Sequence, residues 1–90
     1  MKGPIPDYLE SVDPDSSSFP ASWFDAAIRE LRDDQYFVHC QICGKPFKSL
    51  AQVLTLQADH KTPRCRGGKT TWVNLQILCG PCNLRKRDSI

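Results

Sequence analysis

The stretch that decides the fold contains Ala58-Asp59-His60, then Asn74, then Cys79-Gly80-Pro81-Cys82-Asn83. An earlier pair of cysteines, Cys40 and Cys43, has the same two-residue gap as the later pair. Two CxxC pairs supply four thiolates, which is the number that closes one tetrahedral zinc site. The acid, the imidazole and the amides are not needed for that zinc, so they indicate a second kind of chemistry.

The spacing of the cysteines favours a metal site over disulfides. The five cysteines fall as two pairs and a single Cys65, so an intramolecular disulfide scheme leaves one thiol over. A thioredoxin-like redox motif would explain one CxxC pair, but it does not predict two in a small basic chain. His39 is a substitute ligand in principle, although four thiolates already complete the zinc shell. We therefore expect one structural zinc, bound by Cys40, Cys43, Cys79 and Cys82.

Charge is distributed unevenly along the chain. Residues 1–39 contain three basic and eight acidic side chains, whereas residues 40–90 contain nine basic and two acidic ones. A basic half suits a polyanion such as DNA, because each neutralised phosphate releases counterions. A solvated basic face is the alternative, and charge alone does not exclude it. The acidic half is a candidate docking surface for a larger protein partner.

The length and the N-terminal sequence limit the class of protein. Ninety residues make one small domain, which commonly needs a metal, disulfides or a partner for stability. The chain opens on Met1-Lys2-Gly3-Pro4 and acidic sequence, without the apolar stretch of a signal peptide. No apolar run approaches the length that spans a membrane. We expect a soluble, cytoplasmic protein of bacterial or phage type.

The chain divides into an acidic flexible arm, residues 1–18, and a single domain, residues 19–90. Apolar residues at helical spacing predict a helix at about 22–34, with Ser22 as its N-cap. The expected elements that follow are a zinc knuckle at 40–44, one helical turn within 47–53, a strand at 54–60, a loop at 62–71, an apolar extended or turn-like stretch at 72–78 and a short helix at 83–88. Residues 54–90 would thus form a ββα unit in a small α+β fold.

The remaining polar residues suit a hard divalent cation. A carboxylate (Asp59) and an amide oxygen (Asn83) are the donors that Mg²⁺ or Mn²⁺ prefers, with water and phosphate completing the shell. His60, neutral near physiological pH, is suited to accept a proton from an attacking water. Taken singly, each has an ordinary alternative: a surface Asp-His pair, an Asn74 that bridges a turn, and an Asn83 that caps a helix. Their order beside the zinc knuckle favours the catalytic interpretation.

This arrangement resembles the HNH endonuclease family, whose core is a ββα-metal fold with a treble-clef-like zinc site. The segments that carry the resemblance are 56–63, Gly67-Gly68 and 72–86, together with Cys40 and Cys43. By that resemblance His60 is the general base, and Asp59 and Asn83 are the ligands of the catalytic ion. Asn74 matches the central family asparagine, which positions the histidine and braces the loop. Asn83 stands where the family often has histidine, which leaves the metal preference open.

One geometric requirement follows from the sequence. Consecutive strand residues point to opposite faces, yet Asp59 and His60 must reach one phosphate. We expect the strand to bend or end there, or the phosphate to lie across its edge. The residues expected to contact DNA phosphates are Lys61, Arg64, Arg66, Lys69, Arg85, Lys86 and Arg87.

The leading hypothesis is a metal-dependent DNA endonuclease that nicks, or that cuts both strands as a homodimer. By the resemblance it leaves 5′-phosphate and 3′-hydroxyl ends. One helix and one loop offer little surface for recognising a long site, so we expect low sequence specificity. The alternatives are a non-catalytic, zinc-stabilised nucleic-acid-binding module and an accessory subunit of a larger nuclease or phage assembly.

Overall fold

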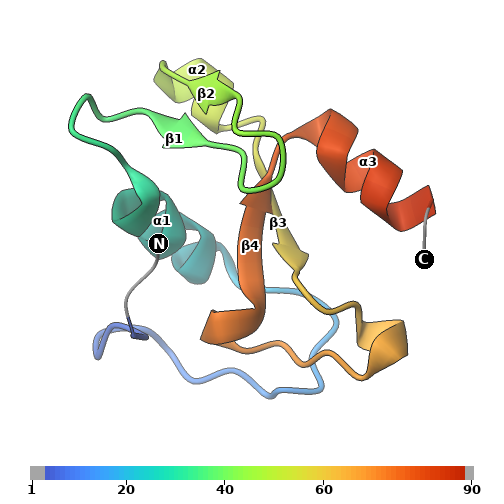
Figure 1. Ribbon diagram of the computed structural model, residues 1–90. Helices are drawn as coiled ribbons and strands as arrows, with labels where there is room; N and C mark the ends of the chain where they lie inside the picture. Colours follow the sequence, from blue (N-terminus) through green and yellow to red (C-terminus); the bar gives the residue numbers. More distant parts are fainter. Residues whose placement is uncertain (1–3, 89–90) are drawn as a thin grey trace.

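Strand β4, Leu75–Leu78, is the centre of the fold in the computed structural model, which describes residues 4–88 (Figure 1). Leu75, Ile77 and Leu78 have no exposed surface. An apolar strand that is buried at every position needs cover on both faces. The ends of the predicted arm and domain, residues 1–3 and 89–90, lie outside the described residues.

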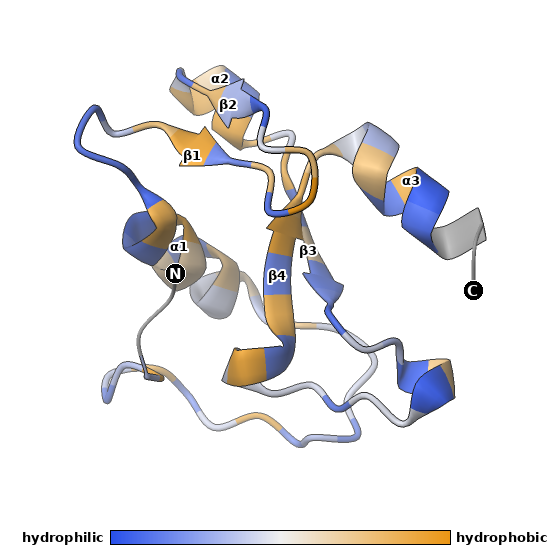
Figure 2. Cartoon of the chain, in the orientation of Figure 1, coloured by the Kyte–Doolittle hydropathy of each residue, from blue (hydrophilic) through white to orange (hydrophobic). Residues whose placement is uncertain are grey.

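Helix α1, Ala21–Leu31, packs against β4 through its apolar face (Figure 2). Trp23, Ala27 and Ile28 recur at helical spacing and are buried. The Trp23 ring meets Trp72 edge-on at a centroid distance of 6.0 Å, a geometry worth about 0.5–1.5 kcal/mol beyond burial. The helix therefore belongs to the core, as its stripe predicts.

The predicted cap of this helix is wrong. The N-cap is Pro20, which makes no side-chain hydrogen bond, and the Ser22 hydroxyl donates to the Glu10 carboxylate at 2.8 Å instead. The helix also ends at Leu31, three residues before the predicted end. The reason is Asp33, whose carboxylate accepts hydrogen bonds from backbone N–H groups of the following turn and so competes with the helix.

The zinc knuckle connects two short strands, β1 (Val38–His39) and β2 (Pro46–Phe47), which pair antiparallel. Gly44 has a φ of 78°, the left-handed conformation that the tight turn requires. Helix α2, Leu50–Val53, is a single turn that begins with a capping box between Ser49 and Gln52.

The ββα unit consists of β3 (Gln57–His60), β4 and helix α3 (Gly80–Asp88). β3 and β4 pair antiparallel, with Asp59 opposite Gln76 and His60 opposite Leu75. β3 is shorter than the predicted strand because Leu54 and Thr55 bond back to helix α2. Helix α3 starts earlier than predicted, with Pro81 in its first turn, where a missing N–H is tolerated.

Short 3₁₀ turns interrupt the connection between β3 and β4, at Arg64–Arg66 and Trp72–Asn74. Helix α3 lies beside β3, and together β3, β4 and α3 form one side of the molecule (Figure 1). The predicted small α+β fold with a ββα unit and four gathered cysteines is confirmed.

Candidate functional site

The four cysteines of the CxxC pairs meet at one point between the β1–β2 hairpin and the start of α3. Their sulfur atoms all lie within 4.8 Å of one another, and the Sγ atoms of Cys43 and Cys79 are 3.8 Å apart. A tetrahedron with zinc–sulfur distances of about 2.3 Å has sulfur–sulfur edges of about 3.8 Å. The cluster therefore has the donor type, number and spacing that bind a zinc ion.

The thiols of this cluster differ in acidity. Burial opposes ionisation of Cys40, but backbone N–H groups, chiefly of Cys43 and Cys79, outweigh it and lower the pKa to about 6. Burial raises the pKa of Cys79 to about 11. The Arg85 guanidinium donates to Cys82 Sγ at 3.2 Å. Ionising all four thiols needs a divalent cation to offset the charge, so metal binding will release protons.

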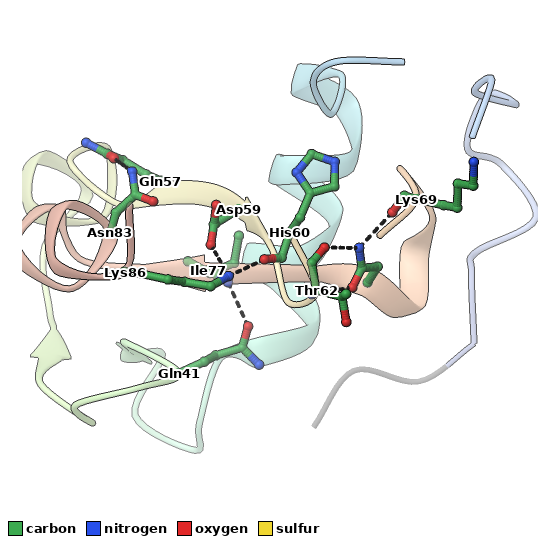
Figure 3. A network of polar contacts seen from close by, with 10 residues as sticks. Gln41, Gln57, Asp59, His60, Thr62, Lys69, Ile77, Asn83 and Lys86 are labelled. Atoms are coloured by element: carbon green, nitrogen blue, oxygen red, sulfur yellow. Dashed lines mark hydrogen bonds and ion pairs between the residues drawn. The ribbon is translucent and has the colours of Figure 1, made fainter. Parts of the chain in front are cut away.

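Two polar residues fasten the knuckle to the rest of the domain. Gln41 donates its backbone N–H to the Ile77 carbonyl at 3.0 Å, and its side-chain oxygen accepts the Ile77 N–H at 2.7 Å (Figure 3). His39 bonds through Nδ1 to the Gly44 carbonyl and through Nε2 to Asp33, each at 3.0 Å. The hydrogen bond that the ring donates to the Asp33 carboxylate raises the His39 pKa. Because both ring nitrogens are engaged, His39 braces the knuckle and is not placed as a zinc ligand.

Asp59 points toward helix α3, where it meets a positive charge (Figure 3). The Lys86 Nζ atom lies 2.5 Å from Asp59 Oδ2 and also donates to the backbone carbonyl of His60. Only 17% of the Lys86 side chain and 21% of the Asp59 side chain are exposed. The Lys86 ammonium group thus lies between a carboxylate oxygen and a carbonyl oxygen. The oxygen atoms at this position suit a cation.

Asn83 lies one helical turn before Lys86, on the side of α3 that faces β3. Its amide N–H₂ donates to the side-chain oxygen of Gln57, and its amide oxygen lies on the Asp59 side (Figure 3). Asn83 also follows Cys82 directly, and its backbone N–H bonds to the Cys79 carbonyl at 3.0 Å. The zinc site therefore fixes the start of the helix from which Asn83 and Lys86 reach β3.

The donor set of Asp59 and Asn83 fits a hard divalent ion. A carboxylate oxygen and an amide oxygen on facing elements are ligands of the kind that Mg²⁺ or Mn²⁺ takes, leaving positions for water and phosphate. The Lys86 ammonium shows that a cation is accommodated beside Asp59. That Asp59 and Asn83 hold such an ion stays a prediction.

His60 ends β3 and is held by residues from two distant segments. Its Nε2 atom lies 2.8 Å from the Thr70 hydroxyl, and the Phe19 ring packs on the imidazole at a centroid distance of 4.4 Å. Burial lowers the His60 pKa below its ordinary value, while Asp59 acts against this shift. The imidazole is therefore neutral at neutral pH and has a lone pair available to accept a proton.

Asn74 ties together the two ends of the loop that follows His60. Its side-chain oxygen accepts the Thr62 N–H at 2.8 Å, and its amide donates to the carbonyls of Thr62 and Lys69. Its own carbonyl accepts the Lys61 N–H at 2.7 Å. Gly68 belongs to the same tight arrangement, since a Cβ there would lie 1.8 Å from the Thr62 carbonyl oxygen. These contacts match the bracing geometry expected of Asn74.

β3 ends at His60, where a bend or an end of the strand is expected, and a shared site for Asp59 and His60 stays a prediction. All four residues of β3 pair regularly with β4, and the strand ends at His60. β3 has only one strand partner in its two-stranded sheet, so its other edge is turned toward α3. A phosphate lying across that edge would face Asp59 and the end of the strand together.

The basic residues divide into two groups. Lys61 and Arg66 have exposed side chains, whereas others are engaged within the protein: Arg64 with the Asp15 carbonyl, Lys69 with the Asp15 carboxylate, Arg85 with Cys82, and Lys86 with Asp59. The side chain of Arg87 lies outside the described part of the structure. Contact of these residues with DNA stays a prediction.

Sequence reasoning missed four contributors to the site, namely Ser16, Phe19, Gln57 and Thr70. Each contacts another residue of the site that is far away in sequence. Local spacing along the chain does not predict such contacts. The signal for Gln57 was present, because it precedes Asp59 by two residues and so shares its face of the strand. Ser16 and Phe19 were assigned to the arm and its boundary with the domain, away from the site.

The family model described as HNH endonuclease matches residues 40–89, which is more than half of the chain. Comparison with curated proteins and with solved structures finds no match. The matched range contains the four cysteines, the β3–β4 hairpin with Asp59, His60 and Asn74, and helix α3 up to its end. On this match, and on the ββα unit and its metal-binding cysteines, the chain belongs to the HNH endonuclease family.

Proposed function

We propose that the protein is a metal-dependent DNA endonuclease that hydrolyses phosphodiester bonds at the edge between β3 and α3. Family membership supports a nuclease-type enzyme with DNA as its substrate. The observation that supports the proposal is that Asp59 and His60 end β3, while Asn83 lies on α3, the helix that contacts β3. A protein that only binds DNA gains nothing from an acid at that place.

The roles follow from the chemistry of the side chains. His60 takes a proton from a water molecule as the water oxygen attacks phosphorus, and the bond from phosphorus to the 3′ oxygen breaks. The departing 3′ oxygen then takes a proton from solvent, which leaves a 5′-phosphate and a 3′-hydroxyl. A divalent ion, when bound by Asp59 and Asn83, supplies positive charge that stabilises the transition state. Asn74 holds the loop that follows His60.

Several finer features belong to the same proposal. In this proposal, exposed Lys61 and Arg66 contact phosphates, which carry no sequence information, so we expect low specificity. The protein nicks one strand as a monomer or cuts both as a homodimer. Residues 19–90 form the nuclease domain and residues 1–18 an acidic arm.

None of the helices in residues 4–88 is long and apolar enough to cross a membrane.

Supercoiled plasmid incubated with Mg²⁺, Mn²⁺ or EDTA tests the proposal. We expect conversion to open circle with either metal and none with EDTA, and the His60→Ala variant purified in parallel controls for contaminating nuclease. DNA binding measured by fluorescence anisotropy accompanies each reaction. Binding without cleavage under every metal condition would favour the non-catalytic binding module and overturn the proposal.

The rate of cleavage should depend on pH through His60. A base works only when unprotonated, so activity is lost as pH falls through its pKa and is constant above it. Because burial lowers that pKa below 6.5, we expect kcat/KM to be level at neutral pH and to decline only below the ordinary histidine range. The measurement is kcat/KM for plasmid nicking against pH at saturating Mn²⁺. A midpoint above the ordinary value would contradict the assignment of His60 as base.

Divalent metal and the Lys86 ammonium should compete for Asp59. Replacing Lys86 with methionine removes the competing charge, so we expect Mn²⁺ to bind more tightly by roughly 1 kcal/mol, about fivefold. Asp59→Asn should abolish the same binding event while zinc content stays unchanged. Titration of the zinc-loaded protein with Mn²⁺, followed by electron paramagnetic resonance without DNA, measures both.

The matched control for the titration is Asp15→Asn. Asp15 also pairs with a lysine, Lys69, but it is exposed and distant in sequence from the candidate ligands. Its substitution should leave Mn²⁺ affinity unchanged. Equal affinity in the wild-type, Lys86→Met and Asp59→Asn proteins would show that the ion binds elsewhere.

A further inference from the structure

We propose that Thr70 and the N-terminal segment Asp13–Phe19 form a seat that fixes the tautomer and orientation of the His60 imidazole. In this proposal Thr70 is a positioning residue, and Nδ1 is the nitrogen that accepts the proton. The inference rests on the proposed function of His60 as a base, and it extends that function to Thr70 and to Ser16 and Phe19, the last two of which lie outside the family match. The name His60 seat is used below for Ser16, Phe19 and Thr70.

The Thr70 hydroxyl decides which imidazole nitrogen carries the hydrogen. The hydroxyl has one hydrogen, and its contact of 2.5 Å with the Ser16 carbonyl uses it, since a carbonyl can only accept. The second contact of the same oxygen, 2.8 Å from His60 Nε2, must therefore have the ring as donor. A neutral imidazole with its hydrogen on Nε2 has its lone pair on Nδ1.

The direction of the ring agrees with that assignment. The Nδ1 atom lies on the side of Asp59, and Nε2 is turned away from it (Figure 3). The lone pair is thus directed toward the edge where the candidate cation ligands lie. If the ring were turned over or held the other tautomer, an N–H group would point at the attacking water and no proton could be accepted there.

The His60 seat is anchored well enough to hold that direction. Thr70 is 1% exposed, and its backbone N–H donates to the Pro14 carbonyl at 2.8 Å. Phe19 lies against the imidazole at 4.4 Å between centroids, with 36° between the ring planes, which restricts rotation of the ring. Asp15 adds an ion pair with Lys69 at 2.7 Å and accepts from Arg64 through its carbonyl.

These contacts connect the acidic half of the sequence to the basic half. The acidic half places Asp15 against basic residues of the loop between β3 and β4, across 54 positions of sequence from Lys69. The same segment delivers the Ser16 carbonyl to Thr70. Attraction between the two halves therefore places the backbone acceptor that the His60 seat requires. Mobility of the arm in solution stays a prediction.

The test compares Thr70→Val with Thr70→Ser in the zinc-loaded full-length protein. Valine preserves shape but has no hydroxyl, whereas serine retains it. Long-range ¹H–¹⁵N spectra of the imidazole, recorded at mildly alkaline pH without DNA or Mg²⁺, report the tautomer directly. We expect a protonated Nε2 in wild type and Thr70→Ser, and a shift toward the other tautomer in Thr70→Val.

Kinetics supply the second readout. A misdirected base slows the chemical step and leaves substrate binding alone, so Thr70→Val should lower kcat for plasmid nicking about 10- to 100-fold with unchanged KM, and Thr70→Ser should restore it. Phe19→Leu, which keeps the hydroxyl contact, is a second variant that should retain the wild-type tautomer.

The two readouts separate failure of this inference from failure of the proposed function. A wild-type ring protonated on Nδ1, or spectra unchanged by Thr70→Val, overturns the inference whatever the activity. If the tautomer depends on the His60 seat but the protein never cleaves DNA, the proposed function is overturned. The inference about the His60 seat then still stands.

Discussion

Replacing Cys82 with serine will cost the protein its zinc and, with it, its stable fold. Structural zinc contributes about 10–16 kcal/mol of apparent binding free energy in small zinc domains, which exceeds the stability of a typical domain of this size. Cys82 is 3% exposed and shares a cluster with three other sulfur atoms. A serine hydroxyl is a poor zinc ligand, and it would leave three thiolates crowded without a cation. Metal analysis of the purified protein and a thermal melt by circular dichroism measure the effect.

Two controls show whether this loss is specific. Cys65→Ser replaces the exposed cysteine that stands outside the cluster, so zinc content and the melting temperature should match wild type. Asn83→Ala changes the neighbour of Cys82 and removes the bond to Gln57, and it should keep the zinc and the fold while reducing activity. If Cys82→Ser and Asn83→Ala behaved alike, the separation between a structural and a catalytic metal would be wrong.

His60→Ala should lower the rate of plasmid cleavage by about 10²–10⁴-fold, the range that a positioned general base contributes. The zinc cluster contains no His60 atom, so the zinc content and the secondary structure should persist. Affinity for DNA should change little, because the substitution removes no charge at neutral pH. Initial rates of nicking at saturating Mn²⁺, with binding measured in EDTA, separate the two effects.

His39→Ala is the matched control, since it removes the other histidine of the chain. His39 is exposed and bonds to Asp33 and Gly44 on the knuckle, away from β3. Cleavage by this variant should stay within a few-fold of wild type. Equal rates for His60→Ala and wild type would remove His60 from the mechanism.

Much of the fold could be predicted from sequence because its signals are local. The CxxC pairs predict a metal cluster, the glycine after Cys43 predicts the knuckle turn, and the apolar stripe within 22–34 predicts a core helix. Boundaries were less predictable, because competing hydrogen bonds set them. Asp33 ends α1 early, and the hydrogen bonds of Leu54 and Thr55 back to α2 shorten the strand that follows.

The site was predictable only in part, for a physical reason. Asp59, His60, Asn74 and Asn83 were predicted as site residues because their order along the chain carries information. The partners that orient them come from far away: Lys86 lies 27 positions from Asp59, and Ser16 lies 54 positions from Thr70. Such contacts depend on how the arm and helix α3 pack, and no periodicity encodes them. Lys86 in particular was assigned to DNA, whereas its charge lies against Asp59.

Because Asn83 directly follows Cys82, the cysteine cluster and the candidate catalytic residues are linked at the start of α3. The first turn of α3 is shaped by sulfur atoms that zinc gathers, and the rest of that helix carries the groups facing β3. The placement of Asn83 and Lys86 against β3 should therefore depend on a metal ion at the four cysteines, although neither residue belongs to that cluster.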